Sequence, residues 1–328
     1  MREQSLPRSI VFSTDLLEPL INLSLRAEAA GFHRVWTTEY PHRDAIVRAL
    51  AIALRTERIR VATGISYAFS RSSLALASMA ADVQRLAGGR FALGLGPGTR
   101  GVRRWYDADF DPPAAKLLGC ADAVRQAWRR NPHLADPPPL YASALGATIG
   151  RRVASTFDGV LLHPLALSPT HLHERLLPAI RQGAGDRKTP HIVAWCITSV
   201  DAEEERARHR ARSQLAFYFS TPSYATVAEG TSWEDVPARV REAFRIDPSR
   251  KWGDLARLIP DKMLDDLTLS GTRADVAAKS AALAQDLSQA GVAEIAFAAA
   301  GADVGLDEFR HSCGQVIEAL GQSAPTQG

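Results

Sequence analysis

An acidic residue and a tyrosine stand side by side at the end of an apolar run, where they could do acid–base chemistry. The run Arg34 to Thr38 is typical of a strand, and Glu39 and Tyr40 follow it directly. A carboxylate in a cleft can have a raised pKa and exchange a proton with a substrate, whereas tyrosine donates a hydrogen bond but is a poor base at neutral pH. We therefore predict Glu39 and Tyr40 as the catalytic residues. The alternative for Glu39 is an ion pair with a neighbouring arginine.

Three glycine-containing segments could bring the backbone close to a ligand. RVATGIS and FALGLGPG each end a strand in glycine, which permits close approach, although an ordinary strand end or a plain tight turn would look the same. In ASALGAT, Gly146 precedes a helix whose free N–H groups and dipole favour a phosphate, and Arg151 and Arg152 could add charge unless they are merely solvated. The predicted ligand-binding residues are Thr38, Thr63, Gly64, Ile65, Ser66, Gly96, Pro97, Gly98, Ala144, Leu145, Gly146, Ala147 and Thr148.

A further set of side chains is predicted to line a substrate pocket. His163 ends the run Gly159 to His163, where a structural, hydrogen-bonded histidine is equally common. Trp105 could stack on a substrate or simply cover core, and His42 could act in catalysis or lie exposed in a loop. The predicted pocket residues are Ser13, His42, Tyr67, Phe69, Trp105 and His163.

The elements that would position these residues alternate between short apolar runs and longer amphipathic stretches, as expected of parallel strands joined by crossover helices. Glycine ends several of the helical stretches. Eight runs match the strand number of a (β/α)8 TIM barrel. The predicted strands are Ser9 to Ser13, Arg34 to Thr38, Ile59 to Gly64, Arg90 to Leu95, Pro139 to Ala142, Gly159 to His163, His191 to Thr198 and Glu294 to Ala299.

A Rossmann-type open sheet is the main competing architecture, because glycines follow the strand in FALGLGPG. A dinucleotide fingerprint needs its glycines to open the next helix directly, whereas here a proline and a further segment intervene, which favours the barrel. We expect one barrel domain over residues 1–328. Residues 220–266 break the alternation and form an insertion before the last strand, either a lid or pocket element or a peripheral buttress. Residues 321–328 are expected to be disordered.

Composition limits the classes of partner. The 328 residues include 39 Lys and Arg against 36 Asp and Glu, a balance that does not favour nucleic acid. Three scattered cysteines match neither a metal-ligand spacing nor a disulfide framework, so we expect no metal and a reducing compartment. No signal peptide and no run long enough to cross a bilayer is visible, so we expect a cytoplasmic protein without a membrane partner.

Several segments together resemble one enzyme family. VWTTEY, RIRVATGIS, GGRFALGLGPG, PPLYASALGATIGRRVASTFDG and LTLSGTRADVAAKSAALAQDLSQAGVAEIAF are similar to segments of the bacterial luciferase-like oxidoreductases. The similarity is strongest to the methylene-tetrahydromethanopterin reductase branch, which uses the deazaflavin coenzyme F-420. The resemblance implies a flavin or deazaflavin at the C-terminal ends of the barrel strands. It also implies a non-prolyl cis peptide between Gly64 and Ile65, a glycine turn beside the cofactor, and the cofactor phosphate at Gly146.

The sequence departs from that branch around the reacting face. Many relatives follow the acidic residue of strand two with His, where this chain has Tyr40. An Asn-Pro-Tyr-like stretch is replaced by Tyr67, Ala68 and Phe69, and the first strand lacks the branch's early acidic residue. A methanopterin substrate is therefore not assumed.

Three functions follow as hypotheses. The first is a coenzyme F-420-dependent oxidoreductase that transfers a hydride to or from a small molecule, reducing a C=C or C=N bond. The second is an FMN-dependent monooxygenase, in which the pocket shields an oxygenated flavin from water. The third is a non-catalytic barrel acting as a binding subunit. We also expect a homodimer that packs through the early helical stretches, residues 44–55 and 72–86.

Overall fold

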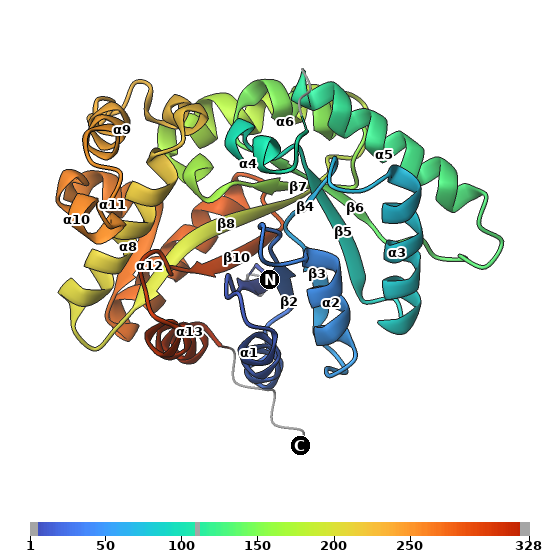
Figure 1. The fold of residues 1–328 in the computed structure, drawn as a ribbon, viewed down its shortest axis with the longest axis horizontal. Coiled ribbons are helices and arrows are strands. Elements are labelled where there is room, and N and C mark those ends of the chain that lie inside the picture. Colours follow the sequence, from blue (N-terminus) through green and yellow to red (C-terminus); the bar gives the residue numbers. More distant parts are fainter. Residues whose placement is uncertain (1–5, 109–111, 322–328) are drawn as a thin grey trace.

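The computed structural model describes residues 6–108 and 112–321. Within these residues, parallel strands close into a barrel in the order β10-β1-β2-β3-β5-β6-β7-β8, with β8 pairing back to β10 (Figure 1). The predicted (β/α)8 barrel is confirmed and the open Rossmann-type sheet was wrong. The barrel strands are β1 (Arg8–Val11), β2 (Arg34–Thr37), β3 (Arg60–Thr63), β5 (Phe91–Gly96), β6 (Leu140–Ala144), β7 (Gly159–Leu162), β8 (His191–Val200) and β10 (Glu294–Ala299).

Two further strands extend the sheet at the C-terminal end of the barrel. The two-residue strand β4 (Ser66–Tyr67) pairs with β5. Strand β9 (Thr268–Gly271) pairs with the last four residues of β8. Ile197 of β8 pairs with β10 on one edge and with β9 on the other. The edge that pairs with β9 is the one that pairs with β7 closer to the start of β8. Neither strand was predicted.

Helices surround the barrel on the outside (Figure 1). The predicted amphipathic stretches form α1, α2, α3, α5 and α12. Local signals begin these helices: the Asp44 carboxylate accepts from the amides of Ile46 and Val47, and Thr272 with Asp275 forms a capping box. The helices around the barrel are α1 (Leu17–Ala29), α2 (Ala45–Ala53), α3 (Ser73–Leu86), α4 (Arg100–Trp105), α5 (Pro113–Arg129), α6 (Ala147–Ala154), α7 (Leu177–Ala184), α12 (Arg273–Gln289) and α13 (Leu306–Leu320), with η1 (Pro164–Leu167) and η2 (His171–Leu176) between β7 and α7.

The insertion before the last barrel strand is helical and has a core of its own. Phe219, Trp233 and Met263 are buried in it, and they pack with Ile197 and Ala300 from the barrel. The insertion therefore packs against the C-terminal end of β8 and β10, and its role as a lid or pocket element or as a buttress stays a prediction. Helix α8 (Glu204–Phe219) precedes the insertion, whose elements are η3 (Pro222–Ala228), α9 (Val236–Ile246), α10 (Trp252–Leu255), η4 (Ala256–Leu258) and α11 (Asp261–Leu267). Of the predicted disordered tail, residues 322–328 lie outside the described residues.

A buried ionic network fills the N-terminal end of the barrel. Glu294, the first residue of β10, is fully buried and accepts hydrogen bonds from Ser9 Oγ at 2.6 Å, Trp36 Nε1 at 3.0 Å and Arg34 Nη1 at 2.8 Å. The Arg34 guanidinium also stacks over the rings of Trp36 and Tyr141. Hydrogen bonds to every member let charged groups occupy an interior that would otherwise be apolar.

Glu28, near the end of α1, holds the segment that enters β3. Its Oε1 accepts from the backbone amides of Glu57, Arg58 and Ile59 at 3.0, 2.7 and 2.9 Å. Burial raises the pKa of Glu28, but the three amide bonds and Arg58 outweigh it, so the pKa lies below its usual value. We expect Glu28→Ala to cost about 1–3 kcal/mol of unfolding free energy at neutral pH.

The pH dependence of that cost follows from the lowered pKa. A carboxylate with a depressed folded-state pKa stabilises the protein fully above its unfolded pKa, and the contribution is lost as the pH falls through the folded pKa. The difference between wild type and Glu28→Ala in urea unfolding should therefore be constant near neutrality and shrink in acid. A difference that grew on acidification would contradict this assignment.

Candidate active site

The end of β3 forms a bulge next to the end of β2. The peptide bond between Gly64 and Ile65 is cis, as the family resemblance implied. The Gly64 amide donates to Thr37 O at 2.7 Å, and the Glu39 amide donates to Ile65 O at 3.2 Å. Thr38 thus lies between two backbone hydrogen bonds that join β2 to the bulge.

Trp195 of β8 lies against the bulge inside the barrel. A Cβ atom on Gly64 would come within 2.3 Å of Trp195 Cζ2 and 3.1 Å of Trp36 Cε3, so only glycine fits there. Among the described residues, neither Trp195 Nε1 nor Thr38 Oγ1 has a hydrogen-bond partner, although both atoms are buried. Buried polar atoms are normally paired, so two such atoms beside one bulge indicate a site for a ligand with polar groups.

The other two predicted ligand segments flank this bulge. A Cβ on Gly96 would lie 2.5 Å from Ile65 Cδ1 and 2.7 Å from Ser143 Oγ, and Gly98 adopts a positive φ of 63° at the turn that follows. Gly146 precedes α6, and no side chain caps that helix. The first amides of α6 therefore have no side-chain cap, and an anion bound there stays a prediction. Arg151 and Arg152 lie in the last turn of α6, which corrects the expectation that they add charge at its start.

Glu39 is held in an ion pair with Arg71. Its side chain is only 2% exposed, and Arg71 Nη1 lies 3.0 and 3.1 Å from its two carboxylate oxygens. Ser66 Oγ and Ser70 Oγ donate to the same carboxylate at 2.7 and 2.9 Å. Arg71 also pairs with Asp44. This is the ion pair named as the alternative for Glu39; the catalytic role of Glu39 stays a prediction, and the contacts favour a role in positioning the bulge.

Removing the positive charge from this network should destabilise the protein. Arg71→Met leaves the Glu39 carboxylate buried without its cation, and we expect a loss of about 2–3 kcal/mol of unfolding free energy, below the full cost for a buried pair because Arg71 keeps 19% of its side chain exposed. The double variant Arg71→Met/Glu39→Gln should recover much of the loss. The matched control is Arg245→Met, which breaks an exposed pair with Glu242 and should leave the midpoint of the same urea titration almost unchanged. Equal losses for both single variants would refute the assignment.

Aromatic side chains gather around Tyr40 and the glycine turn. Tyr40 meets the edge of Trp105 with ring centroids 5.6 Å apart, and Tyr67 stacks on Phe69 at 5.3 Å. Tyr106 contacts both Tyr67 and Phe69. Burial raises the pKa of Tyr40, so its hydroxyl stays protonated and acts as a donor. The structure therefore brings together the predicted residues Tyr40, Tyr67, Phe69 and Trp105.

A second aromatic group lies around His163, directly after β7. Its ring is 4.6 Å from that of Tyr224, which lies in η3 of the insertion, and 5.1 Å from that of Tyr218 near the end of α8. Burial raises the pKa of Tyr224, and Tyr40 adds to this shift, so the two aromatic groups lie near one another at the barrel mouth. Sequence reasoning missed Tyr218 and Tyr224. The only signal was their position, because Tyr224 lies within residues 220–266 and Tyr218 lies just before them.

Three predicted residues lie apart or are engaged elsewhere. Ser13 and His42 are exposed, and the Ser13 carbonyl accepts from Arg43 at 3.0 Å. The first strand was predicted to reach Ser13, but β1 ends at Val11, so Ser13 lies beyond the barrel wall. The Thr63 hydroxyl both donates to and accepts from the backbone of Gly94 at 2.8 Å, so it joins β3 to β5.

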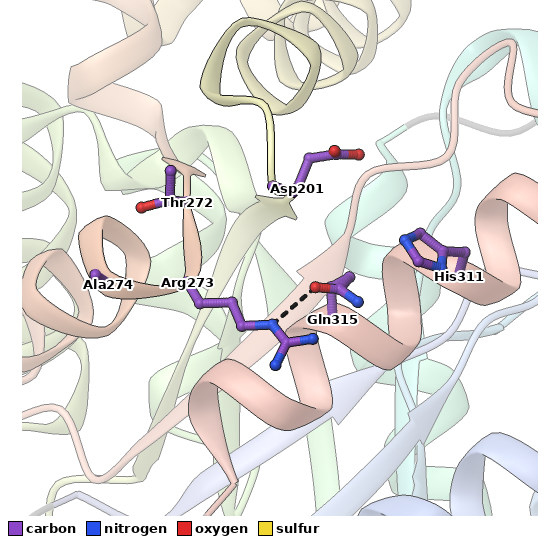
Figure 2. Close-up of a pocket in the computed structure, with 7 residues that line it drawn as sticks. Asp201, Thr272, Arg273, Ala274, His311 and Gln315 are labelled. Carbon is purple, nitrogen blue, oxygen red and sulfur yellow. Dashed lines mark hydrogen bonds between the residues drawn. The ribbon is translucent and has the colours of Figure 1, made fainter.

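A separate surface pocket lies between α12 and α13. Figure 2 shows Arg273 reaching Gln315, with Nε donating to the amide oxygen at 2.8 Å, beside Asp201 and His311. Asp201 accepts from Arg210 at 2.6 Å and Arg273 also pairs with Glu318. Since its charged groups are already paired, we do not assign this pocket to the active site.

Comparison with known proteins identifies the family. The family model of the luciferase-like monooxygenases matches residues 8–290 of this chain. The chain belongs to this family. Luciferase-like relatives include the 5,10-methylenetetrahydromethanopterin reductase of Archaeoglobus fulgidus, which is 27% identical over 304 residues, covering 86% of this chain and 89% of the relative.

Solved structures show the same luciferase-like fold. The coenzyme F-420 dependent tetrahydromethanopterin reductase from Methanopyrus kandleri superposes with a TM-score of 0.76 at 18% identity, covering 96% of this chain and 98% of that one. A monooxygenase from Streptomyces bottropensis gives 0.68 at 18% identity, with 96% and 98% covered. No described helix is long and apolar enough to span a membrane, and no three potential metal-ligating His, Cys, Asp or Glu residues cluster in the described part of the chain.

Proposed function

We propose that this protein is a coenzyme F-420-dependent oxidoreductase that transfers a hydride to or from a small organic molecule and reduces a C=C or C=N bond. The observation that carries the proposal is the bulge at Gly64, where buried Trp195 Nε1 and Thr38 Oγ1 lack partners among the described residues. The similarity to a methylenetetrahydromethanopterin reductase over most of the chain supports a deazaflavin rather than another group.

The residues of the strand ends fit such a cofactor. Gly64, Ile65 and Gly96 would form the wall behind its ring system, because their backbone can be approached closely. The uncapped start of α6 at Gly146 would hold its phosphate. When bound, a deazaflavin supplies a hydride donor and acceptor.

The chain itself contributes position and protonation around that cofactor. Arg71, Ser66 and Ser70 hold the Glu39 carboxylate in place, and Glu39 in turn holds the loop that carries the two serines. The Tyr40 hydroxyl has no hydrogen-bond partner among the described residues and is protonated at neutral pH, so it is the better donor of the predicted pair.

The test is a titration of purified protein with deazaflavin and with FMN, followed by absorbance and fluorescence. We expect saturable binding of coenzyme F-420 at lower concentration than FMN, followed by oxidation of the reduced deazaflavin when an acceptor is added. Binding of neither compound would refute the proposal and support the non-catalytic hypothesis.

An FMN-dependent monooxygenase is the second candidate. The aromatic group of Tyr67, Phe69, Trp105 and Tyr106 favours it, because an apolar wall protects an oxygenated flavin from water. Oxygen consumption with reduced FMN, and none with reduced deazaflavin, would select this function over the first.

We also propose a homodimer formed through α2 and α3. Large apolar side chains are exposed on or just beyond these helices: Val47 at 50%, Leu54 at 59%, Leu74 at 68% and Leu86 at 57%. We expect a dimer in analytical ultracentrifugation, and a monomer for the Val47→Glu/Leu74→Glu variant. The control is Ile246→Glu on α9, which is equally exposed and should remain dimeric. A wild-type monomer, or dissociation by Ile246→Glu alone, would overturn the proposed interface.

A further inference from the structure

His163 is held in one orientation at the barrel mouth. It follows β7 directly, and Pro164 starts the short helix η1 behind it. The Leu165 amide donates to His163 Nδ1 at 3.3 Å, so this nitrogen acts as an acceptor and the proton of the neutral ring lies on Nε2. Burial lowers the pKa of His163 to about 3, which keeps the ring neutral near pH 7. Nε2 has no hydrogen-bond partner among the described residues, and the side chain keeps part of its surface accessible.

Two tyrosines beside the His163 ring add two further neutral donors. The rings of Tyr218 and Tyr224 contact that of His163, and both side chains are partly accessible. Burial raises the pKa of Tyr218 to about 12 and raises that of Tyr224 as well, so both hydroxyls are protonated. In the described part of the chain neither hydroxyl is hydrogen bonded. Three unpartnered donors in a mostly enclosed place are costly unless a ligand or water meets them.

The surroundings of this group contain no unpaired charge. Burial is the cause of the lowered pKa of His163, and the described ring contacts of His163 are the uncharged side chains of Tyr218 and Tyr224. Arg43 is the one described cation that affects Tyr218, and it pairs with Asp15 at 3.0 Å. Glu39 is neutralised by Arg71. A carboxylate or phosphate would have no counter-ion here, whereas an uncharged oxygen acceptor would have three donors.

We propose that His163, Tyr218 and Tyr224 form the substrate-binding wall and hold the carbonyl oxygen of an uncharged, conjugated ketone. The aromatic faces accommodate a flat apolar body, and the three donors polarise the carbonyl. A carbonyl conjugated to C=C draws electron density from the carbon that would receive a hydride, so binding at this wall also activates the bond to be reduced. The inference rests on the proposed oxidoreductase function and names its substrate class.

Simple packing of the insertion onto the barrel is the competing explanation. Packing requires the rings but not the polar atoms, so Tyr→Phe substitutions would leave it intact. A binding role requires the hydroxyls and Nε2–H. Variants that remove only these groups therefore separate the two explanations.

The experiment measures binding of cyclohex-2-enone to the deazaflavin-loaded protein by calorimetry, together with the infrared carbonyl stretch of the bound ketone. We expect Tyr218→Phe and Tyr224→Phe each to weaken binding roughly three- to tenfold, and His163→Phe by more than about tenfold, with cofactor affinity unchanged. The carbonyl stretch should lie at lower wavenumber in wild type and return toward its free value in Tyr224→Phe. Cyclohex-1-ene-1-carboxylate should bind at least about tenfold more weakly than the ketone.

Tyr141→Phe is the matched control, since it removes a hydroxyl that contacts His191 at the N-terminal end of the barrel and should leave ketone binding unchanged. Unchanged affinity in all three wall variants would overturn the inference. So would a wild-type protein that binds deazaflavin but not cyclohex-2-enone. A protein that binds no deazaflavin would instead refute the proposed function on which the inference rests.

Discussion

Glu294→Ala is expected to remove about 3–5 kcal/mol of the unfolding free energy, the largest loss we anticipate from a single side chain. Glu294 is fully buried, and its loss leaves the 6%-exposed Arg34 side chain without a counter-ion. Trp36 Nε1 and Ser9 Oγ lose their acceptor at the same time. The measurement is equilibrium unfolding in urea, with the midpoint and the slope compared to those of wild type.

Two further variants identify the cause of this loss. Glu294→Leu/Arg34→Leu removes both charges, and we expect it to be more stable than Glu294→Ala because no ion is left unpaired. Glu318→Ala removes a carboxylate that is 42% exposed and pairs with Arg26, so it should cost under about 1 kcal/mol. A double variant less stable than Glu294→Ala would show that shape, and not charge pairing, governs this end of the barrel.

Gly64→Ala is expected to weaken cofactor binding by more than about tenfold and to lower stability by about 1–3 kcal/mol. The added Cβ would meet Trp195 Cζ2 at 2.3 Å and Cη2 at 2.7 Å, and a ring packed inside the barrel cannot move aside freely. Either the bulge or the tryptophan must shift, and both border the proposed cofactor site. Stability would be read from urea unfolding and affinity from the deazaflavin titration.

The controls separate steric conflict from a general effect of replacing glycine. Gly64→Ala/Trp195→Leu removes the conflicting ring and should recover stability without restoring the wild-type affinity. Gly119→Ala lies on the exposed side of α5, where an added Cβ meets nothing within 4 Å, and should stabilise the protein by about 0.5–1 kcal/mol. A Gly64→Ala protein with wild-type stability and affinity would disprove the close packing inferred for the bulge.

The barrel could be predicted because its strands are buried on both faces and therefore appear as continuous apolar runs. Strand β4 was missed because it contains only two residues, and β9 because its sequence TLSG lacks the apolar run that marks the predicted strands. The insertion was recognised by its composition, but not its helices, which are short and interrupted by Pro, Gly and Trp.

The site was predictable where a local motif positions it and not where distant segments meet. The glycine segments predict a close approach of the backbone from local sequence alone. The pairing of Glu39 with Arg71 spans 32 residues, and the contact of His163 with Tyr224 depends on how the insertion folds back over β7. Such contacts require the tertiary structure. Trp195 was hidden in the same way, because a buried tryptophan in a strand is usually core.

The filled N-terminal end of the barrel also determines the order in which ligands exchange. Glu294, Arg34 and the rings of Trp36 and Tyr141 fill that end, as in other barrels whose interior is a packed core and not a pore. A cofactor against Gly64 and a ketone at His163 would therefore enter and leave by the same mouth. This geometry favours compulsory-order kinetics, with the cofactor binding first and leaving last, and product-inhibition patterns would reveal that sequence.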